Sequence, residues 1–205
     1  MKIINHVQSS IEWLLWRQDR ITATSASILM GLNRFKTLND LWEEMLGIKP
    51  PEPLNDKMRR GQELEPIARD LFIKETGIEV TPICCEHDTE WWMAASLDGI
   101  SQDHTIVCEI KCPKLKTHKE AIDGIIPDYY YAQMQHQLFV TGASRVLYTS
   151  YHPEHSQKLF IKDIKPNQEF INELRERSKY FYHNNICQMR SPFSELETLL
   201  LDSKH

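Results

Sequence analysis

The apolar residues of this chain recur at helical spacing over much of its length. Residues 9–19, 24–30 and 37–46 have this pattern, so the first quarter of the chain is predicted to be helical. Residues 57–76 repeat it, and Gly77 is expected to end that helix. Residues 128–141 and 166–186 return to the helical pattern, and a last short helix is predicted near 193–201.

Five shorter segments are rich in β-branched or aromatic residues and are predicted to be strands. They are residues 78–84, 91–97, 105–112, 144–151 and 157–164. This order predicts an α/β (α+β) fold, in which helices flank one mixed sheet. We expect a single domain over 1–205, with a helical part at 1–50, a core at 55–165 and C-terminal helices at 166–205, and we interpret KPPEPLND at 49–56 as a loop.

Composition narrows the class of protein. A chain of 205 residues that is 41% hydrophobic can bury a full core, and no apolar run is long enough to cross a membrane. The start of the chain lacks the pattern of a secretory signal, so a cytoplasmic protein with five free thiols is expected. Because the formal net charge is −5, any binding to nucleic acid would require a local basic surface.

Charged residues interrupt the apolar strand in the stretch CEIKCP at 108–113. Side chains alternate across a strand, so Glu109 and Lys111 share one face, and Cys108, Ile110 and Cys112 share the other. The charged pair is therefore presented together on a rigid element.

The preceding strand ends in SLDGI, and SQDH at 101–104 has the composition of a turn. The two strands are predicted to form a hairpin with Gln102 and Asp103 in the loop. Asp98 would then lie opposite Val107, and Ser96 opposite Glu109. This register places four side chains on one face: Ser96, Asp98, Glu109 and Lys111.

An acidic pair beside a lysine suits metal-assisted hydrolysis of a phosphodiester. Carboxylates on neighbouring strands offer the hard oxygen ligands that Mg²⁺ or Mn²⁺ prefers, with positions left for water and a phosphate oxygen. A neighbouring ammonium group can orient the attacking water and offset developing negative charge. The structural alternative is an ordinary ion pair facing solvent.

The motif SLDGI followed by EIKCP resembles the core of the PD-(D/E)XK nuclease superfamily, and within it the lambda exonuclease family. Three further stretches match that family in order: WRQDRITAT at 16–24, RGQELEPIARDLF at 60–72 and YYAQMQHQLFVTG at 130–142. The resemblance implies a restriction-endonuclease-like sheet flanked by helices. It also implies Mg²⁺-dependent 5′ to 3′ digestion of one strand of duplex DNA, which leaves 3′ overhangs for recombination.

The same resemblance implies roles for single residues. Asp98, Glu109 and the backbone carbonyl of Ile110 match the metal ligands, and Lys111 matches the residue that positions the nucleophilic water. Glu65 matches an acidic residue on the preceding helix that helps to hold a second metal or a water in its shell.

Glu65 has two local complications. Pro66 follows it directly, so the helix is expected to kink there or to restart with Glu65 near its cap. Glu63 lies nearby and is the alternative ligand, and a solvated helix carboxylate is the alternative role for Glu65.

A pocket for the terminal 5′-phosphate is also implied by the resemblance. Its residues map to Arg17, Thr24, Ser96 and Gln135, with Ser25 as a substitute for Thr24. The simpler interpretation is that Thr24 or Ser25 caps a helix. Gln135 lies on a largely apolar face, where its amide needs a partner, which is either the substrate or the backbone.

Basic residues flank these motifs and are candidates for contacts with the DNA backbone. They lie in GLNRFKT, before the Glu65 helix, and in the predicted loop PKLKTHK: Arg34, Lys36, Lys57, Arg59, Arg60, Lys114, Lys116 and Lys119. By resemblance, the expected partners are double-stranded DNA ends, two further copies of the chain in a trimeric ring, and a single-strand annealing protein. A phage or prophage origin in a bacterial cytoplasm is expected. A restriction-like or structure-specific endonuclease and a non-hydrolytic end-binding module remain alternatives.

Overall fold

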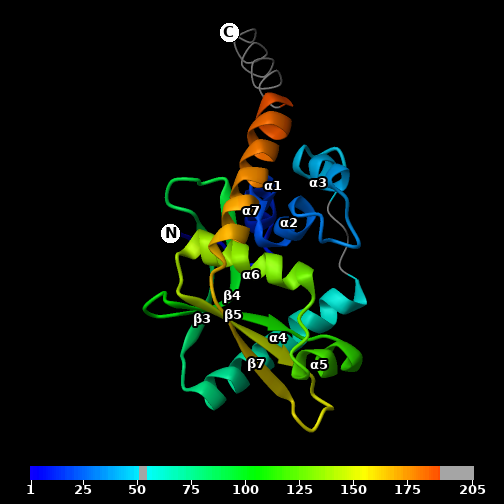
Figure 1. Ribbon diagram of the computed structural model, residues 1–205, viewed down its shortest axis with the longest axis vertical. Coiled ribbons are helices and arrows are strands. Elements are labelled where there is room, and N and C mark those ends of the chain that lie inside the picture. Colours follow the sequence, from blue (N-terminus) through cyan, green and yellow to red (C-terminus); the bar gives the residue numbers. More distant parts are fainter. Residues whose placement is uncertain (51–54, 190–205) are drawn as a thin grey trace.

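A seven-stranded mixed sheet forms the centre of the molecule (Figure 1). The computed structural model describes residues 1–50 and 55–189. The strands are β1 (Lys2–Ile4), β2 (Ile21–Thr22), β3 (Val80–Glu86), β4 (Met93–Ser101), β5 (Ile106–Lys111), β6 (Arg145–Tyr151) and β7 (Leu159–Ile164). Their order is β1-β3-β4-β5-β6-β7, with β2 beside β4; β5–β6 and β2–β4 are parallel and the other pairs are antiparallel. The prediction of one mixed sheet flanked by helices is confirmed.

Helices cover both faces of this sheet. They are α1 (Ile11–Gln18), α2 (Ala23–Leu29), α3 (Leu38–Met45), α4 (Asp56–Thr76), α5 (Leu115–Ile122), α6 (Asp128–Thr141) and α7 (Gln168–Tyr180), which a π-helix, η1 (Phe181–Cys187), continues. The helix predicted near 193–201 lies outside the described residues. Within the described part of the chain, no helix has the length and apolar character of a membrane span.

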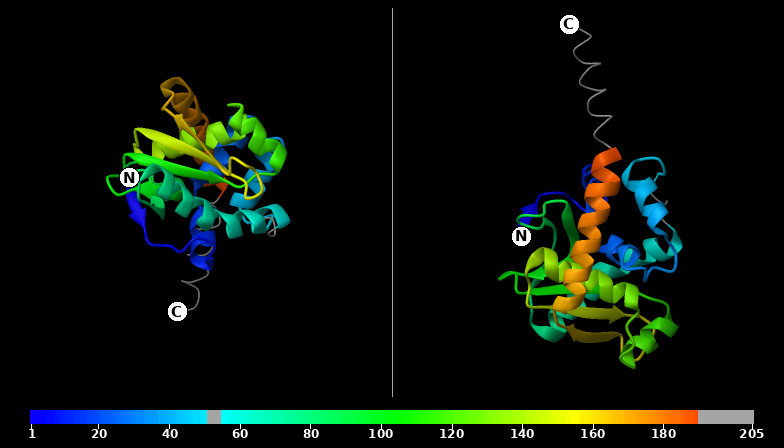
Figure 2. Two further views of the ribbon diagram at one scale, coloured as in Figure 1. Left: turned by 90° about the horizontal axis from the view of Figure 1, so that it is seen from below. Right: turned by 45° about the horizontal axis from the view of Figure 1, so that its top comes forward.

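Two apolar clusters divide the helices between the faces. On one face, Phe72 of α4 packs with Cys108 and Ile110 of β5. On the other, Met134 of α6 packs with Val107 of β5 in a larger cluster that includes residues of α2, α3 and α7. Figure 2 shows α4 and α6 on opposite sides of the sheet. Cys108 therefore faces away from the charged side chains, as predicted, and all five cysteines are free thiols.

The long helix α4 differs from its prediction. The Asn55 side chain accepts a hydrogen bond from the Met58 amide at its start, and Gly77 ends it with φ of 67°. Pro66 lies inside one continuous helix, so the expected restart at Glu65 is wrong. The exposed Pro66 ring is accommodated on the solvent side of the helix.

Three short elements were not predicted. The strands β1 and β2 contain only three and two residues, which is too short for a periodic signal. The basic stretch after β5 was predicted as a loop, but most of it forms α5, with His118 and Ala121 buried. Its lysines are therefore presented on a helix.

The β4–β5 hairpin has a different register from the predicted one. The observed pairs are Gly99 with Cys108 and Ile100 with Val107, so the predicted pairing of Asp98 with Val107 is wrong. The reason is the loop, which spans residues 102–105 and not two residues. The Asp103 carboxylate stabilises it by accepting hydrogen bonds from the Ser101 hydroxyl (2.6 Å) and the Thr105 amide (3.1 Å).

A β-bulge lies in β4 beside Asp98. Thr81 pairs with Ile100, but Ile83, two residues further along β3, pairs with Leu97, three residues back along β4. Leu97 and Ile100 consequently lie in the same apolar cluster, although simple alternation would separate them. Counting alternate residues along β4 placed Ser96 on the same face as Asp98. This prediction is wrong, because the bulge interrupts the alternation between these two residues.

Gly99, inside the bulge, is expected to be sensitive to substitution. A Cβ atom there would lie 2.8 Å from Val80 Cγ2 and 3.4 Å from Cys108 Cβ. Gly99→Ala is expected to lower the free energy of unfolding by about 1–3 kcal/mol, measured by urea titration. Gly61→Ala in α4 is the matched control, because a Cβ atom there would meet nothing within 4 Å beyond the backbone of its own helix. This variant should stabilise the protein by about 0.5–1 kcal/mol. Equal stability of the two variants would contradict this prediction.

Candidate active site

The site begins where the β4–β5 backbone ladder ends. Beyond the Gly99–Cys108 pair, the Ile110 amide donates a 2.8 Å hydrogen bond to Asp98 Oδ2. A carboxylate oxygen thus takes the position that a backbone carbonyl would otherwise fill. This bond fixes the Asp98 side chain between the two strands.

Glu109 is held by three donors. The Gln133 Nε2 atom donates to Oε1 over 2.6 Å, Gln137 Nε2 donates to Oε2, and the Lys111 ammonium forms an ion pair with Oε1. Only 1% of Glu109 is exposed, so each carboxylate oxygen has a partner inside the protein. The orientation of this carboxylate is therefore fixed by α6 as well as by its own strand.

Lys111 extends from β5 toward α6. Its Nζ atom lies 5.0 Å from the centroid of the Tyr130 ring, in a cation–π arrangement. Burial alone would lower the pKa of Lys111, but the negative charges of Glu109 and Asp98 outweigh it and raise the pKa above its ordinary value. The lysine is thus a cation at neutral pH.

Glu65 joins the site from α4. Its carboxylate pairs with Arg69, and Arg69 Nε donates a 2.7 Å hydrogen bond to the backbone carbonyl of Asp98. Burial, and then the charge of Glu109, raise the pKa of Asp98 well above its ordinary value. Burial also raises the pKa of Glu65, against the lowering effect of Arg69. Glu63, the alternative ligand, is exposed.

The acidic side chains fit a divalent metal chemically. Asp98 and Glu109 supply hard carboxylate oxygens, and their mutual repulsion would be relieved by a cation. Across residues 1–50 and 55–189, however, no three His, Cys, Asp or Glu side chains converge on one point. The ion pairs of Glu109 with Lys111 and of Glu65 with Arg69 occupy oxygens that a metal would share.

A second cluster of polar side chains lies at the junction of α1 and α2. Arg17 Nη2 donates to Thr24 Oγ1 (3.2 Å), which is 3.0 Å from Thr22 Oγ1. The guanidinium lies over the Trp13 ring, and Trp13 Nε1 donates a 2.8 Å hydrogen bond to Ser96 Oγ. Three predicted phosphate-pocket residues, Arg17, Thr24 and Ser96, are therefore brought together.

The other two predicted pocket residues have partners elsewhere. Ser25 is buried and its hydroxyl accepts a 3.4 Å hydrogen bond from the Thr22 amide, which makes it part of the α2 cap. Gln135 is fully buried, with its amide bonded to the Lys165 carbonyl (3.0 Å) and the Asn167 amide (2.8 Å). Ser25 therefore caps α2 and Gln135 bonds to the backbone, which are the alternatives to a phosphate contact given above for these residues.

Sequence reasoning did not identify Gln133 and Gln137 as site residues. A signal was present, because the two are four residues apart and share one face of α6, whereas Gln135 between them points elsewhere. Thr22 and Trp13 were also missed. Their contacts to Arg17 and Ser96 depend on tertiary packing.

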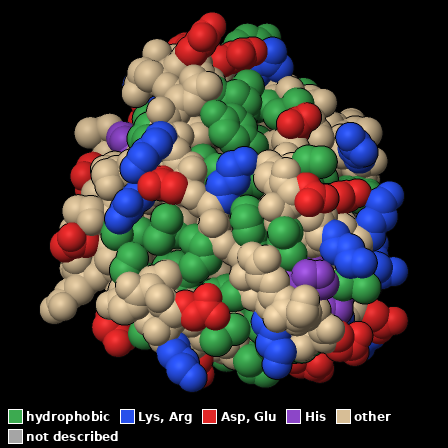
Figure 3. Space-filling view, turned by 60° about the horizontal axis from the view of Figure 1, so that its bottom comes forward, with side chains coloured by type: hydrophobic (Ala, Val, Ile, Leu, Met, Phe, Trp, Pro, Cys, Tyr) green, Lys and Arg blue, Asp and Glu red, His purple; other side chains and the backbone are tan. Residues whose placement is uncertain are grey.

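The basic candidates occupy several elements. Arg34 is exposed in the α2–α3 loop, and Lys114 is exposed at the start of α5. Three others form ion pairs: Lys36 with Glu44, Arg59 with Asp56, and Lys116 with Glu120. Arg60 donates to the Cys112 and Pro113 carbonyls, where it braces the end of β5. Figure 3 shows basic and acidic side chains interspersed on the face in view.

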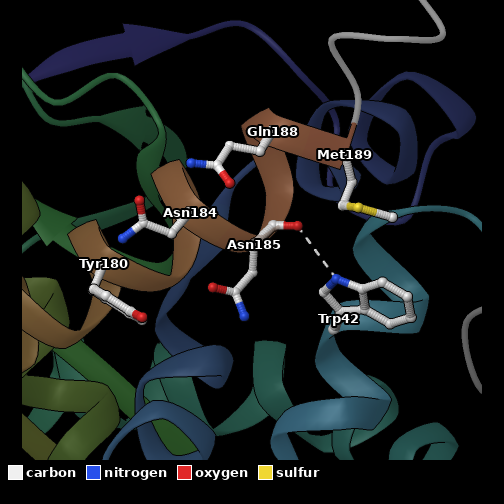
Figure 4. A pocket seen from close by; sticks show the side chains of 6 residues that line it. All are labelled: Trp42, Tyr180, Asn184, Asn185, Gln188 and Met189. Carbon is white, nitrogen blue, oxygen red and sulfur yellow. Dashed lines mark hydrogen bonds between the residues drawn. The ribbon is translucent and has the colours of Figure 1, made fainter.

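A cavity of about 560 Å³ lies apart from these residues, between α3 and η1. Figure 4 shows Trp42, whose Nε1 atom donates a 3.3 Å hydrogen bond to the Asn185 carbonyl at its edge. Among residues 1–50 and 55–189, those that line this cavity include no carboxylate and no cation. The Asp98–Glu109–Lys111 cluster is the candidate active site.

Comparison with known proteins identifies the family. Residues 12–144 match the YqaJ-like viral recombinase domain. This chain belongs to that family. It is 26% identical to YqaJ of Bacillus subtilis over 201 residues and 28% identical to a protein of Acanthamoeba polyphaga mimivirus over 181 residues. The chain spans only 60% and 33% of the lengths of these two proteins.

Solved structures agree with this YqaJ-like assignment. The alkaline exonuclease LHK-Exo of Laribacter hongkongensis superimposes with a TM-score of 0.78 and 29% identity, covering 93% of this chain and 100% of that one. Its complex with dAMP gives a TM-score of 0.77 at 30% identity, covering 91% of this chain and 100% of that one. A phage related exonuclease from Haemophilus somnus, 16% identical, has the same fold (TM-score 0.66, covering 83% and 96%). The similarity supports a recombination nuclease of the phage type.

The raised pKa of Asp98 predicts a cost to stability. A carboxyl whose pKa is raised on folding stabilises the protein below its unfolded-state pKa, and this contribution is lost as pH rises through the folded pKa. Asp98→Asn is therefore expected to increase the free energy of unfolding by about 1 kcal/mol or more near pH 8 without metal, with the difference shrinking toward about pH 4. Urea titrations at both pH values measure this.

The matched control is Asp70→Asn, on the exposed side of α4. It is expected to change the free energy of unfolding by less than about 0.5 kcal/mol at either pH. The prediction for Asp98 is contradicted if Asp98→Asn unfolds at lower urea than the wild type near pH 8.

Proposed function

We propose that this protein is a Mg²⁺-dependent exonuclease that degrades one strand of linear duplex DNA from its 5′ end and leaves 3′ single-stranded overhangs. The observation that carries the proposal is the gathering of Asp98, Glu109 and Lys111 where β4 and β5 separate. The 29–30% identity to an alkaline exonuclease over more than nine-tenths of this chain supports the same chemistry.

The residues have distinct roles in this proposal. Asp98, Glu109 and the backbone carbonyl of Ile110 hold the metal, and Glu65 holds a second metal or a water. Bound Mg²⁺, or Mn²⁺ in its place, would polarise the phosphodiester and make water a better nucleophile. Lys111 orients that water toward phosphorus and offsets the charge that develops as the 3′ oxygen of the terminal nucleotide leaves. Each cycle releases a 5′-mononucleotide.

The cluster around Arg17 gives the enzyme its preference for an end. The guanidinium and the hydroxyls of Thr22 and Thr24 form a set of donors suited to a terminal phosphate. Burial lowers the pKa of Arg17 to about 10, so it stays charged at neutral pH. Ser96, which accepts a hydrogen bond from Trp13, lies two residues before Asp98 on β4 and joins this cluster to the strand that carries the carboxylate.

Digestion of defined DNA tests this function. With Mg²⁺, a 5′-phosphorylated linear duplex should release mononucleotides, a 5′-hydroxyl duplex should be cut more slowly, and a closed circle should persist. EDTA should stop the reaction, and Lys111→Ala should lower kcat by about a hundredfold or more because charge stabilisation is lost. Lys179→Ala, an exposed lysine on α7, is the matched control and should keep wild-type activity.

Other outcomes of this assay select between the alternatives. Cutting of the circle would favour a restriction-like or structure-specific endonuclease. Binding of ends without hydrolysis in Mg²⁺ or Mn²⁺ would favour an end-binding module. Full activity of Lys111→Ala would remove the lysine from the mechanism.

We propose further that the enzyme acts as a trimeric ring around duplex DNA, beside a single-strand annealing protein, in the cytoplasm of a bacterial host of a phage or prophage. The support is the match to a viral recombinase domain. Sedimentation should give three times the 24.1 kDa chain mass. A monomer at working concentration would exclude the ring.

A further inference from the structure

A second cavity, of about 370 Å³, lies between α5, the start of α6 and the α2–α3 loop. Figure 1 shows α5 and the right-hand end of α6 on the same side as that loop. Its apolar wall includes Leu32, Ile125 and Pro127, and Tyr129 adds an aromatic ring. We call this space the aromatic cavity. Its size is in the range of sites that hold small molecules.

Ring contacts link the aromatic cavity to the active site. The Lys111 ammonium lies 5.0 Å from the Tyr130 ring centroid, and the Tyr130 ring lies 4.4 Å from that of Tyr129. The Tyr129 ring in turn contacts Phe35 edge-on, with centroids 6.2 Å apart. A row of aromatic rings therefore leads from the catalytic lysine to the cavity.

Phe35 is unusual because 77% of it is exposed. The exposed Phe35 ring contacts the Tyr129 ring edge-on, and most of its surface is available for stacking. The loop that presents it is fixed, since the Asn33 carboxamide oxygen accepts hydrogen bonds from the Phe35 and Lys36 amides, both 2.8 Å. The ring is therefore held ready outside the core.

The charges around the aromatic cavity are mixed in a way that suits a nucleotide. Arg34 is an exposed cation that can contact phosphates, and Lys116, which is exposed and lies 3.8 Å from Glu120, can exchange this partner for a phosphate. Glu120 and Asp128 also line the space, and they would repel a phosphate but accept hydrogen bonds from the exocyclic amino group of a base. A base inside the cavity would donate to the carboxylates, and its phosphates outside would contact Arg34 and Lys116.

We infer that the aromatic cavity binds an unpaired nucleotide of the strand being cut, next to the scissile phosphate, with its base against Phe35 and Tyr129. The inference rests on the proposed nuclease function for the identity of that strand. The contacts from Tyr129 through Tyr130 to Lys111 favour the cut strand over its complement, because in the proposed mechanism the scissile phosphate lies at Lys111. The stacking would hold the DNA end open beside the catalytic residues.

Fluorescence of 2-aminopurine, which falls when the base stacks, tests this without hydrolysis. The base is placed second from the 5′ end of the strand to be cut, or at the same pair in the complementary strand, and each duplex is titrated with protein in EDTA. The cut-strand probe should be quenched, whereas the complementary probe should change little. Quenching of the complementary probe alone would overturn the assignment of the strand.

Variants identify the rings responsible. Phe35→Leu keeps an apolar side chain but removes the stacking face, so the dissociation constant of the cut-strand probe should rise about fivefold or more, and kcat/KM should fall by a similar factor. Tyr180→Leu, at an exposed ring on α7, is the matched control and should match the wild type.

The two proposals fail in different ways. If the wild type does not hydrolyse DNA but quenches the cut-strand probe in a manner that depends on Phe35, the nucleotide site stands and the nuclease function falls. If the wild type hydrolyses DNA and Phe35→Leu equals it in both quenching and kcat/KM, the nuclease stands and the nucleotide site is overturned.

A base-pair exchange tests the role of the carboxylates. Replacing A by T at the probed position, with the complement changed to match, leaves duplex stability nearly constant but removes the exocyclic amino group from the cut strand. Wild-type kcat/KM should fall by about fivefold or more, on the scale of one lost base contact. Equal rates for the two substrates would exclude Glu120 and Asp128 as base contacts.

Discussion

The hydrogen bond from the Ile110 amide to the Asp98 carboxylate is the interaction on which the site depends. It connects β4 and β5 at the point where their regular ladder stops, so the strands separate without leaving an unpaired buried amide. The bulge beside Asp98 supplies the extra backbone length. A strand pair that continued its ladder through this point would leave no space for a substrate.

The remaining polar contacts balance the charge that this arrangement concentrates. Burial and mutual repulsion raise the pKa values of Asp98 and Glu65, while Lys111 and Arg69 provide the compensating cations. Gln133 and Gln137 orient Glu109 without adding charge. The helix α6 therefore contacts two residues of the site: its glutamines bond to Glu109, and its Tyr130 ring contacts the Lys111 ammonium. Function and stability oppose one another here, as is common where like charges are gathered for chemistry.

The sequence was sufficient for features that depend on local periodicity. Alternation in CEIKCP correctly separated Glu109 and Lys111 from Cys108, and the helical pattern correctly located α4 and α6. It was insufficient where the chain departs from a regular period or where contacts are distant in sequence. The bulge interrupts the alternation between Ser96 and Asp98, and a longer loop shifts the register of the hairpin. Trp13 bonds to Ser96, which lies 83 positions away in the sequence. No local pattern encodes such contacts.

The parallel pairing of β5 with β6 has a consequence for how activity is acquired. A parallel pair cannot close through a tight turn, so the strand that carries Glu109 and Lys111 must wait for α5, α6 and then β6 before both its edges are paired. Contacts of this separation in sequence form late in folding. During synthesis, the strand that carries Glu109 and Lys111 therefore cannot be paired along both edges before residues near Tyr151 have left the ribosome.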